Sequence, residues 1–262
     1  MDHLKARTRR NISQLKEKLP SYNIEITEGD LSGPDISFLP PKRQLIINYP
    51  PYSASHTRYL PINEIPEEFK IIYRVNNALM CSDAIEDGGF KRPFPKEFLE
   101  TKYDVNRGEL LEKNKFAEEI FKFPLINVNE TQLREIPHFY RIDKEIKYVL
   151  FDRYAERNLR ELKKALKSEY VGPEREYTKY SKARVDLRIY HDLARSEPYD
   201  FDMPVEYYRT AGDRLEYGKK LLEEQKDMNC ETFEDVVNLI DKWLKEFNFQ
   251  DDFEWVRSIQ IS

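Results

Sequence analysis

Few residues in this chain of 262 can cross-link the backbone or coordinate a metal, since it has only two cysteines and four histidines. Cys81 and Cys230 lie far apart, and neither belongs to the C-x-x-C pair used by redox motifs and thiolate zinc sites. The histidines are scattered, with no His-x-x-x-His spacing that would place two imidazoles on one helix face. We therefore expect no disulfide framework, no metal ion and no cofactor, and a reducing intracellular compartment, either the cytoplasm or the nucleus.

Long apolar runs are missing as well. No stretch approaches the roughly 18 apolar residues that cross a bilayer, so we expect no contact with a membrane. The first residues lack the apolar segment of a secretory signal, but residues 3–16 contain several cations and no acidic residue. Such a segment is typical of either a sequence that targets the mitochondrial matrix or a basic surface helix, and Asp2 favours the surface helix.

Glycine-rich phosphate loops are absent, because the eight glycines form neither G-x-x-x-x-G-K-[ST] nor G-x-G-x-x-G. The nearest pattern, residues 87–92, is a Gly-Gly turn before two cations. Pro93 and Pro95 argue against a phosphate-binding helix start there, and we interpret residues 87–92 as a turn that ends a helix.

The sequence also lacks the signs of a catalytic nucleophile. There is no G-x-S-x-G turn, and Cys81 lies on the apolar side of a predicted helix. The sequence therefore predicts no catalytic residue and argues against an enzyme.

What the chain does contain is enough apolar and aromatic material for a folded core, at 40% and 13% of its residues. After residue 66, apolar residues recur mostly at helical spacing. The clearest case is the last helix, where Thr232 is a suitable N-cap and Asp235 stands at the capping-box position. Pro124 is expected to end a helix, and Glu145–Asp152 fits a buried strand as well as a helix. The predicted helices are residues 4–19, 67–85, 107–122, 142–170, 174–195, 205–227 and 233–247.

The first sixty residues have a different pattern. Residues 22–27 and 44–48 alternate between apolar and polar side chains as strands do, and they are expected to pair. Prolines around them favour extended connectors that could lie as a strap on another surface. The predicted fold is mainly α with a small β element (α+β), a helical body preceded by a short two-stranded, Pro-rich extended region. The predicted domains are residues 1–63 and residues 64–262.

Charge is distributed unevenly along the chain, although its net value is only −5. Residues 156–190 hold ten lysines and arginines against six acidic residues, whereas residues 197–262 hold eight against seventeen. The basic segments, with tyrosines between the cations, could bind RNA or DNA through its phosphates and bases. A solvated helix face, or docking onto the acidic segment, explains the same pattern. The candidate nucleic-acid-binding residues are Arg7, Arg9, Arg10, Arg157, Arg160, Lys163, Lys164 and Lys167.

A metal-dependent nuclease needs carboxylates for Mg²⁺ and often a lysine beside the attacking water. Asp35, Glu145 and Lys147 supply these residue types, but more than a hundred residues separate the first from the other two. The acidic and aromatic segment Glu197–Pro204 could dock a basic partner, or could be a linker between helices that its aromatic residues anchor.

Our leading hypothesis is a non-catalytic subunit or adaptor of a larger multi-protein assembly, for instance a ribonucleoprotein. It would bind other protein subunits through its extended N-terminal segments and its separated charge patches. The alternatives are a metal-dependent hydrolase acting on nucleic acid and a stand-alone nucleic-acid-binding protein. The composition does not discriminate among the three.

Overall fold

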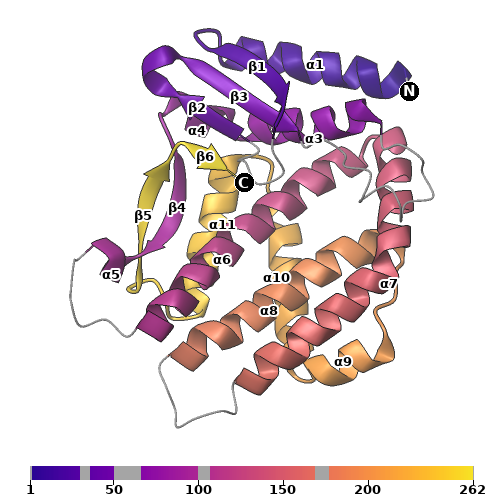
Figure 1. Cartoon of the computed structure of the whole chain (residues 1–262), viewed down its shortest axis with the longest axis vertical. Helices are drawn as coiled ribbons and strands as arrows, with labels where there is room; N and C mark the ends of the chain where they lie inside the picture. The colour runs from indigo at the N-terminus through magenta and orange to yellow at the C-terminus, as the bar shows by residue number, and fades with distance from the viewer. Residues whose placement is uncertain (1, 30–35, 50–65, 100–106, 169–176, 262) are drawn as a thin grey trace.

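The computed structural model describes the chain except for residues 1, 30–35, 50–65, 100–106, 169–176 and 262. Helices dominate it, and a few short strands form small sheets, which confirms the mainly α class with a small β element (Figure 1). The helices are α1 (Asp2–Lys18), α3 (Glu67–Met80), α4 (Ser82–Glu86), α5 (Lys96–Leu99), α6 (Arg107–Arg134), α7 (Pro137–Ser168), α8 (Tyr177–Ser196), α9 (Val205–Ala211), α10 (Arg214–Met228) and α11 (Phe233–Glu246). The strands are β1 (Asn23–Glu28), β2 (Ile36–Leu39), β3 (Gln44–Tyr49), β4 (Phe90–Pro95), β5 (Phe253–Ser258) and β6 (Gln260–Ile261), with 3₁₀ turns η1 (Pro40–Lys42) and η2 (Glu197–Tyr199).

Both strands predicted near the N-terminus are present, and they pair in parallel as β1 and β3. The sheet has four strands in the order β1-β3-β2-β6 rather than the two that we expected. Ile36 of β2 pairs with Ile47 of β3 on one side and with Ile261 of β6 on the other. The sheet therefore joins the first fifty residues to the end of the chain, a long-range pairing that local alternation cannot reveal.

A second sheet consists of β4 and β5, and we predicted neither strand. The prolines of β4 argue against a strand in the sequence, because proline cannot donate a hydrogen bond to a neighbouring strand and is rare inside sheets. In this two-stranded sheet both strands are edges, so Pro93 and Pro95 need not donate on the side away from β5.

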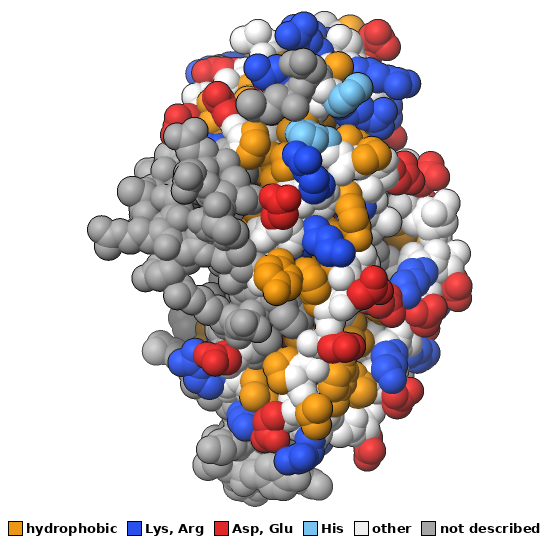
Figure 2. Space-filling view, turned by 90° about the vertical axis from the view of Figure 1, so that its right-hand side faces the viewer, with side chains coloured by type: hydrophobic (Ala, Val, Ile, Leu, Met, Phe, Trp, Pro, Cys, Tyr) orange, Lys and Arg blue, Asp and Glu red, His pale blue; other side chains and the backbone are white. Residues whose placement is uncertain are grey.

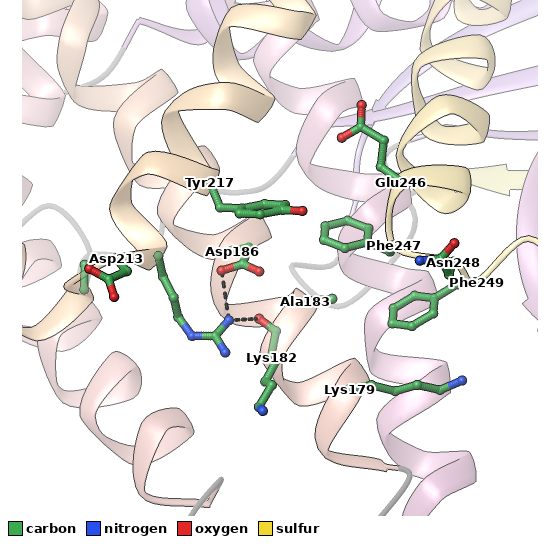
Figure 3. Close-up of a pocket in the computed structure, with 12 residues that line it drawn as sticks. Lys179, Lys182, Ala183, Asp186, Asp213, Tyr217, Glu246, Phe247, Asn248 and Phe249 are labelled. Carbon is green, nitrogen blue, oxygen red and sulfur yellow. Dashed lines mark hydrogen bonds and ion pairs between the residues drawn. The ribbon is translucent and has the colours of Figure 1, made fainter.

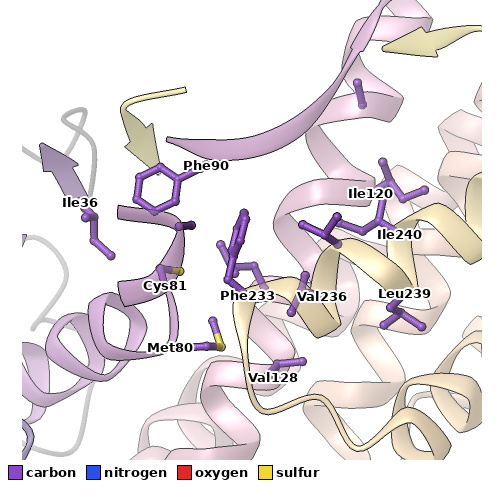
Figure 4. Close-up of a cluster of buried hydrophobic side chains, with 14 of the residues drawn as sticks. Ile36, Met80, Cys81, Phe90, Ile120, Val128, Phe233, Val236, Leu239 and Ile240 are labelled. Carbon is purple, nitrogen blue, oxygen red and sulfur yellow. The ribbon is translucent and has the colours of Figure 1, made fainter. Parts of the chain in front are cut away.

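One hydrophobic core runs through the molecule from α1 and the first sheet to α11 (Figure 4). Ile36 from β2, Phe90 from β4, Ile120 from α6 and Ile240 from α11 are all fully buried in it. The boundary predicted between residues 63 and 64 falls within 50–65, outside the described residues, and the division into two domains stays a prediction. The described part of the N-terminal region is nevertheless packed into the core and is not a free strap.

The helix ends follow local chemistry in some places and tertiary packing in others. The Thr232 hydroxyl oxygen accepts a hydrogen bond from the Asp235 amide, and the Asp235 carboxylate accepts one from the Thr232 amide. These two bonds confirm the capping box. Pro124 was expected to end a helix, but α6 continues through it to Arg134. The residues that follow, Leu125 and Val128, are buried in the core. Their burial outweighs the roughly 3 kcal/mol that an interior proline costs a helix.

Two further helical expectations are resolved by the structure. Glu145–Asp152 belongs to α7, so its interpretation as a strand is wrong. The helix expected over residues 205–227 is broken into α9 and α10 at Gly212, whose φ of +54° suits glycine. Gly218 allows α8 to approach α10 closely, because a Cβ there would lie 2.4 Å from Cγ2 of Ile189 on α8. Among the described helices, none is both long enough and apolar enough to cross a membrane.

Candidate binding groove

A groove of about 840 Å³ opens between α8, α10 and the end of α11 (Figure 3). The helix α8 supplies Lys179 and Lys182, α10 supplies Tyr217, and Phe247 and Phe249 follow the last turn of α11. The chain turns away there because Asn248 adopts a left-handed conformation, with φ of +56°. That turn allows both phenylalanines to face the groove.

Aromatic rings form a continuous shelf along the groove. The Tyr217 ring stacks on Phe247 with centroids 6.5 Å apart, and Phe247 stacks on Phe249 at 5.8 Å. Phe249 in turn contacts Tyr180, whose ring centroid lies 4.7 Å away. Tyr217 remains 44% exposed, so the outer end of the shelf offers an aromatic surface to solvent. Partly exposed aromatic residues of this kind are enriched at protein interfaces.

Charged groups around the shelf are largely neutralised within the groove wall. Arg214 donates at 3.0 Å both to Asp186 and to the carbonyl oxygen of Lys182. Lys179 pairs with Asp252 at 3.0 Å. The lining holds three cations and three carboxylates, so the groove has no net charge. Three charged side chains of the lining are exposed at the rim, those of Lys179, Lys182 and Asp213.

A buried cluster of charged groups lies away from the groove, between α6 and α7. Glu130 accepts from Lys147 at 2.6 Å and from Arg134 at 2.9 Å. Burial alone would raise the pKa of Glu130, but Lys147, Arg195 and Arg134 together lower that pKa to about 2. Lys147 also pairs with Asp143 at 3.0 Å. These groups satisfy one another inside the protein, as buried charges must.

The nuclease candidates do not converge. Lys147 is buried in this cluster, whereas Glu145 is exposed. The two residues are two positions apart on a helix, so their side chains point in nearly opposite directions. Asp35 lies outside the described residues. Within the described residues, no group of three or more histidine, cysteine, aspartate and glutamate side chains could hold a metal ion.

The candidate nucleic-acid-binding residues occupy two separate regions (Figure 1). On α1, Arg9 and Arg10 are exposed and Arg7 is partly buried. The others lie on the second half of α7, whose first half is the part near α1. There Arg160 is exposed and Lys163 pairs with Glu206 at 3.0 Å. The structure does not describe the side chains of the other three candidates on α7, which are Arg157, Lys164 and Lys167.

Positive charge concentrates at the end of the molecule where α1 lies, and Figure 2 shows lysines, arginines and histidines gathered there. Burial and the nearby Arg141 and His3 hold the pKa of His138 below its usual value. This end therefore joins α1 to the start of α7, a grouping that the sequence did not predict.

Several residues singled out from the sequence have structural partners. His191 is buried, bonds to Asn127 at 3.0 Å and stacks on Phe123. Cys81 is buried, and burial raises the pKa of its thiol. In the segment Glu197–Pro204, Tyr199 is buried at the α6–α7 cluster, so the segment is anchored by an aromatic residue.

Sequence reasoning missed the groove because its residues come from helices that are distant in the chain. No local signal marked it, because Tyr217 is four residues before the buried Leu221 and helical spacing places both on the same side of α10. In comparisons with known proteins, no family model matches the chain, and no curated protein or solved structure matches it.

Proposed function

We propose that this protein is a non-catalytic binding subunit that holds a polypeptide segment of a partner protein in the groove between α8, α10 and α11. The observation that carries the proposal is the aromatic shelf, which ends in the 44% exposed ring of Tyr217. Aromatic anchors that remain accessible in a hollow commonly supply most of the binding energy of an interface.

The charge of the groove favours a polypeptide over a nucleic acid. Proteins that follow a phosphate backbone present an excess of cations, because the released counterions drive binding. Here the cations Lys179 and Arg214 are paired with carboxylates, and Asp213 adds a negative charge at the rim. A segment with apolar side chains and charges of both signs complements such a groove.

The buried cluster around Glu130 supports a structural and not a catalytic use of the perturbed groups. A general acid or base must reach its substrate within hydrogen-bond distance. Glu130 and Lys147 are almost fully buried and are engaged with each other. The cations around Glu130 lower its pKa, whereas burial lowers the pKa of Lys147 against the opposing effect of Glu130 and Asp143. Both shifts therefore follow from a structural ion pair inside the protein.

The test compares the tagged wild-type chain with Tyr217→Ala in affinity purification from its own cells, under gentle salt and with quantitative mass spectrometry. We expect Tyr217→Ala to recover about tenfold less of a stoichiometric partner than the wild-type chain, because the truncation removes an aromatic anchor. The control is Tyr148→Ala, because Tyr148 on α7 is 72% exposed and lies away from the groove. A photo-crosslinking residue at position 217 should mark the same partner.

Equal recovery of partners by Tyr217→Ala and Tyr148→Ala would contradict the proposal, as would a chain that purifies alone. A second candidate is nucleic-acid binding by the positive end around Arg9, Arg10 and Arg141. Nuclease treatment before purification separates the two, because a partner held through RNA or DNA is released and one held in the groove is retained.

A further inference from the structure

A second cavity, separate from the groove, lies between β4, α6 and β6. Its volume is about 310 Å³, at the lower end of the range for small-ligand sites. Two strands and one helix bring its walls together, so it is rigidly framed. Its main lining residues are Arg92 and Phe94 of β4, Ala117, Phe121 and Lys122 of α6, and Gln260 of β6.

Two cations on this cavity have no acidic partner among the described residues, Arg92 and Lys122. The Nε atom of Arg92 is buried and has no hydrogen-bond acceptor. A buried donor without an acceptor is costly, and a bound anion would remove that cost. The one acidic residue on the lining, Glu118, already accepts a hydrogen bond from Asn114 at 3.0 Å.

Part of the cavity wall is apolar. Phe94 and Phe121 supply aromatic surface, and Ala117 adds a small apolar side chain. The Arg92 guanidinium stands 5.7 Å from the centroid of the Phe94 ring, which keeps the cation beside the aromatic wall. One cavity thus combines fixed positive charge with an apolar surface, the usual composition of a small-ligand site.

We infer that this cavity binds a carboxylate that carries an apolar group, with Arg92 and Lys122 holding the carboxylate and the two phenylalanines holding the apolar part. Arginine presents a planar fork of donors that matches a carboxylate. The same chemistry occurs in a free organic acid and in the last residue of a peptide that ends in an aromatic side chain.

The test uses amide NMR spectra of the full chain, titrated with 3-phenylpropionate and with an N-acetylated Gly-Gly-Phe peptide that has a free carboxylate. We expect saturable shifts at the amides of Phe94, Ala117 and Gln260 with at least one of the two probes. Binding of the first alone indicates a free acid, and binding of the peptide alone indicates a peptide C-terminus. The neutral 3-phenylpropionamide should bind about tenfold more weakly, because it lacks the charge.

Arg92→Gln and Lys122→Gln should each weaken the binding of the carboxylate by about tenfold. Lys91→Gln is the matched control, since Lys91 is the next residue on β4 and pairs with Glu234 at 3.7 Å. The inference is overturned if neither carboxylate shifts these amides, if the neutral amide binds equally well to the wild-type chain, or if Arg92→Gln binds like Lys91→Gln.

Discussion

Asp192 is a buried carboxyl group whose side chain is almost fully removed from solvent. It lies on α8 and accepts a hydrogen bond from the Tyr207 hydroxyl at 2.8 Å. Burial raises its pKa to about 7, and the hydrogen bond from Tyr207 opposes that rise only in part. The folded protein therefore holds a proton on Asp192 at pH values where the unfolded chain has released it.

This difference predicts how stability depends on pH. Between about pH 4 and about pH 7 the folded state binds more protons at Asp192, so the free energy of unfolding falls as the pH rises. Asp192→Asn cannot ionise and keeps an acceptor for Tyr207. We expect the variant to gain about 3 kcal/mol of stability over wild type between about pH 5 and about pH 8. Urea unfolding of both proteins at about pH 5 and about pH 8 measures it.

Asp227→Asn provides the comparison, because Asp227 is an exposed aspartate on α10. The difference in the free energy of unfolding between Asp227→Asn and wild type should stay nearly constant with pH. If Asp192→Asn showed the same small and constant difference, Asp192 would be ionised in the folded protein, and the explanation from burial would be wrong.

The sequence predicted pairs of interacting side chains only where the two residues are close together in the chain. Thr232 and Asp235 are three residues apart, and their capping box was predicted correctly. Glu130 and Lys147 lie on different helices, and their pairing was not predicted; residue type alone had placed Lys147 in the nuclease alternative. Residue types show what an ionisable group can do, but its environment decides its pKa.

At the scale of elements, the contact between α8 and α10 depends on Gly218. A Cβ at this position would lie 2.4 Å from Cγ2 of Ile189 and 3.1 Å from the amide nitrogen of Tyr190. A glycine inside a helix costs about 1 kcal/mol relative to alanine. The close approach of the two helices, which buries Leu221 and Leu222 on the same face, compensates for that cost.

Gly218→Ala should therefore destabilise the protein by about 1–3 kcal/mol, although alanine is the better helix former. The reason is that Ile189 cannot move away without opening the packed core. Chemical unfolding measures the loss. An Ile189→Ala background removes Cγ2 and leaves the Cβ of residue 189, 2.9 Å from the added methyl. Gly218→Ala should cost less there, and an equal cost in both backgrounds would exclude the contact with Cγ2 as the cause.

Element boundaries were predictable where backbone chemistry alone ends a helix. The turn at Gly88, with φ of +85°, ends α4 as expected. Pro124 and the prolines of β4 were misleading for one reason: packing against the core or an open sheet edge removed the local cost of proline.

At the scale of the whole molecule, the two ends of the chain are joined. β6 pairs with β2, and Phe253 at the start of β5 shares a core with Leu15 of α1. Ile36, Phe38, Leu45 and Ile47 are fully buried, so the first sheet contributes an essential part of that core. This arrangement favours a single cooperative unit.

We predict that a fragment of residues 64–262 does not fold cooperatively. It lacks α1 and the three strands that cover Val75 and Phe90, and exposing that surface costs more than a small domain's whole stability. Thermal melts by circular dichroism and by fluorescence of the buried Trp243 measure it. The control, residues 1–259, loses only β6 and should fold. A sharp transition in the 64–262 fragment would instead support two domains.

The sequence by itself determined the helical class, the capped last helix, the two strands near the N-terminus and the turn that ends α4. These features follow from periodicity, capping and backbone freedom, which act over a few residues. Only the tertiary structure decided that α6 continues through Pro124, that β6 completes the first sheet and that Tyr217 meets Phe247 in a groove. Such contacts join faces that are distant in the chain, and a local pattern shows which face is buried but not what it is buried against.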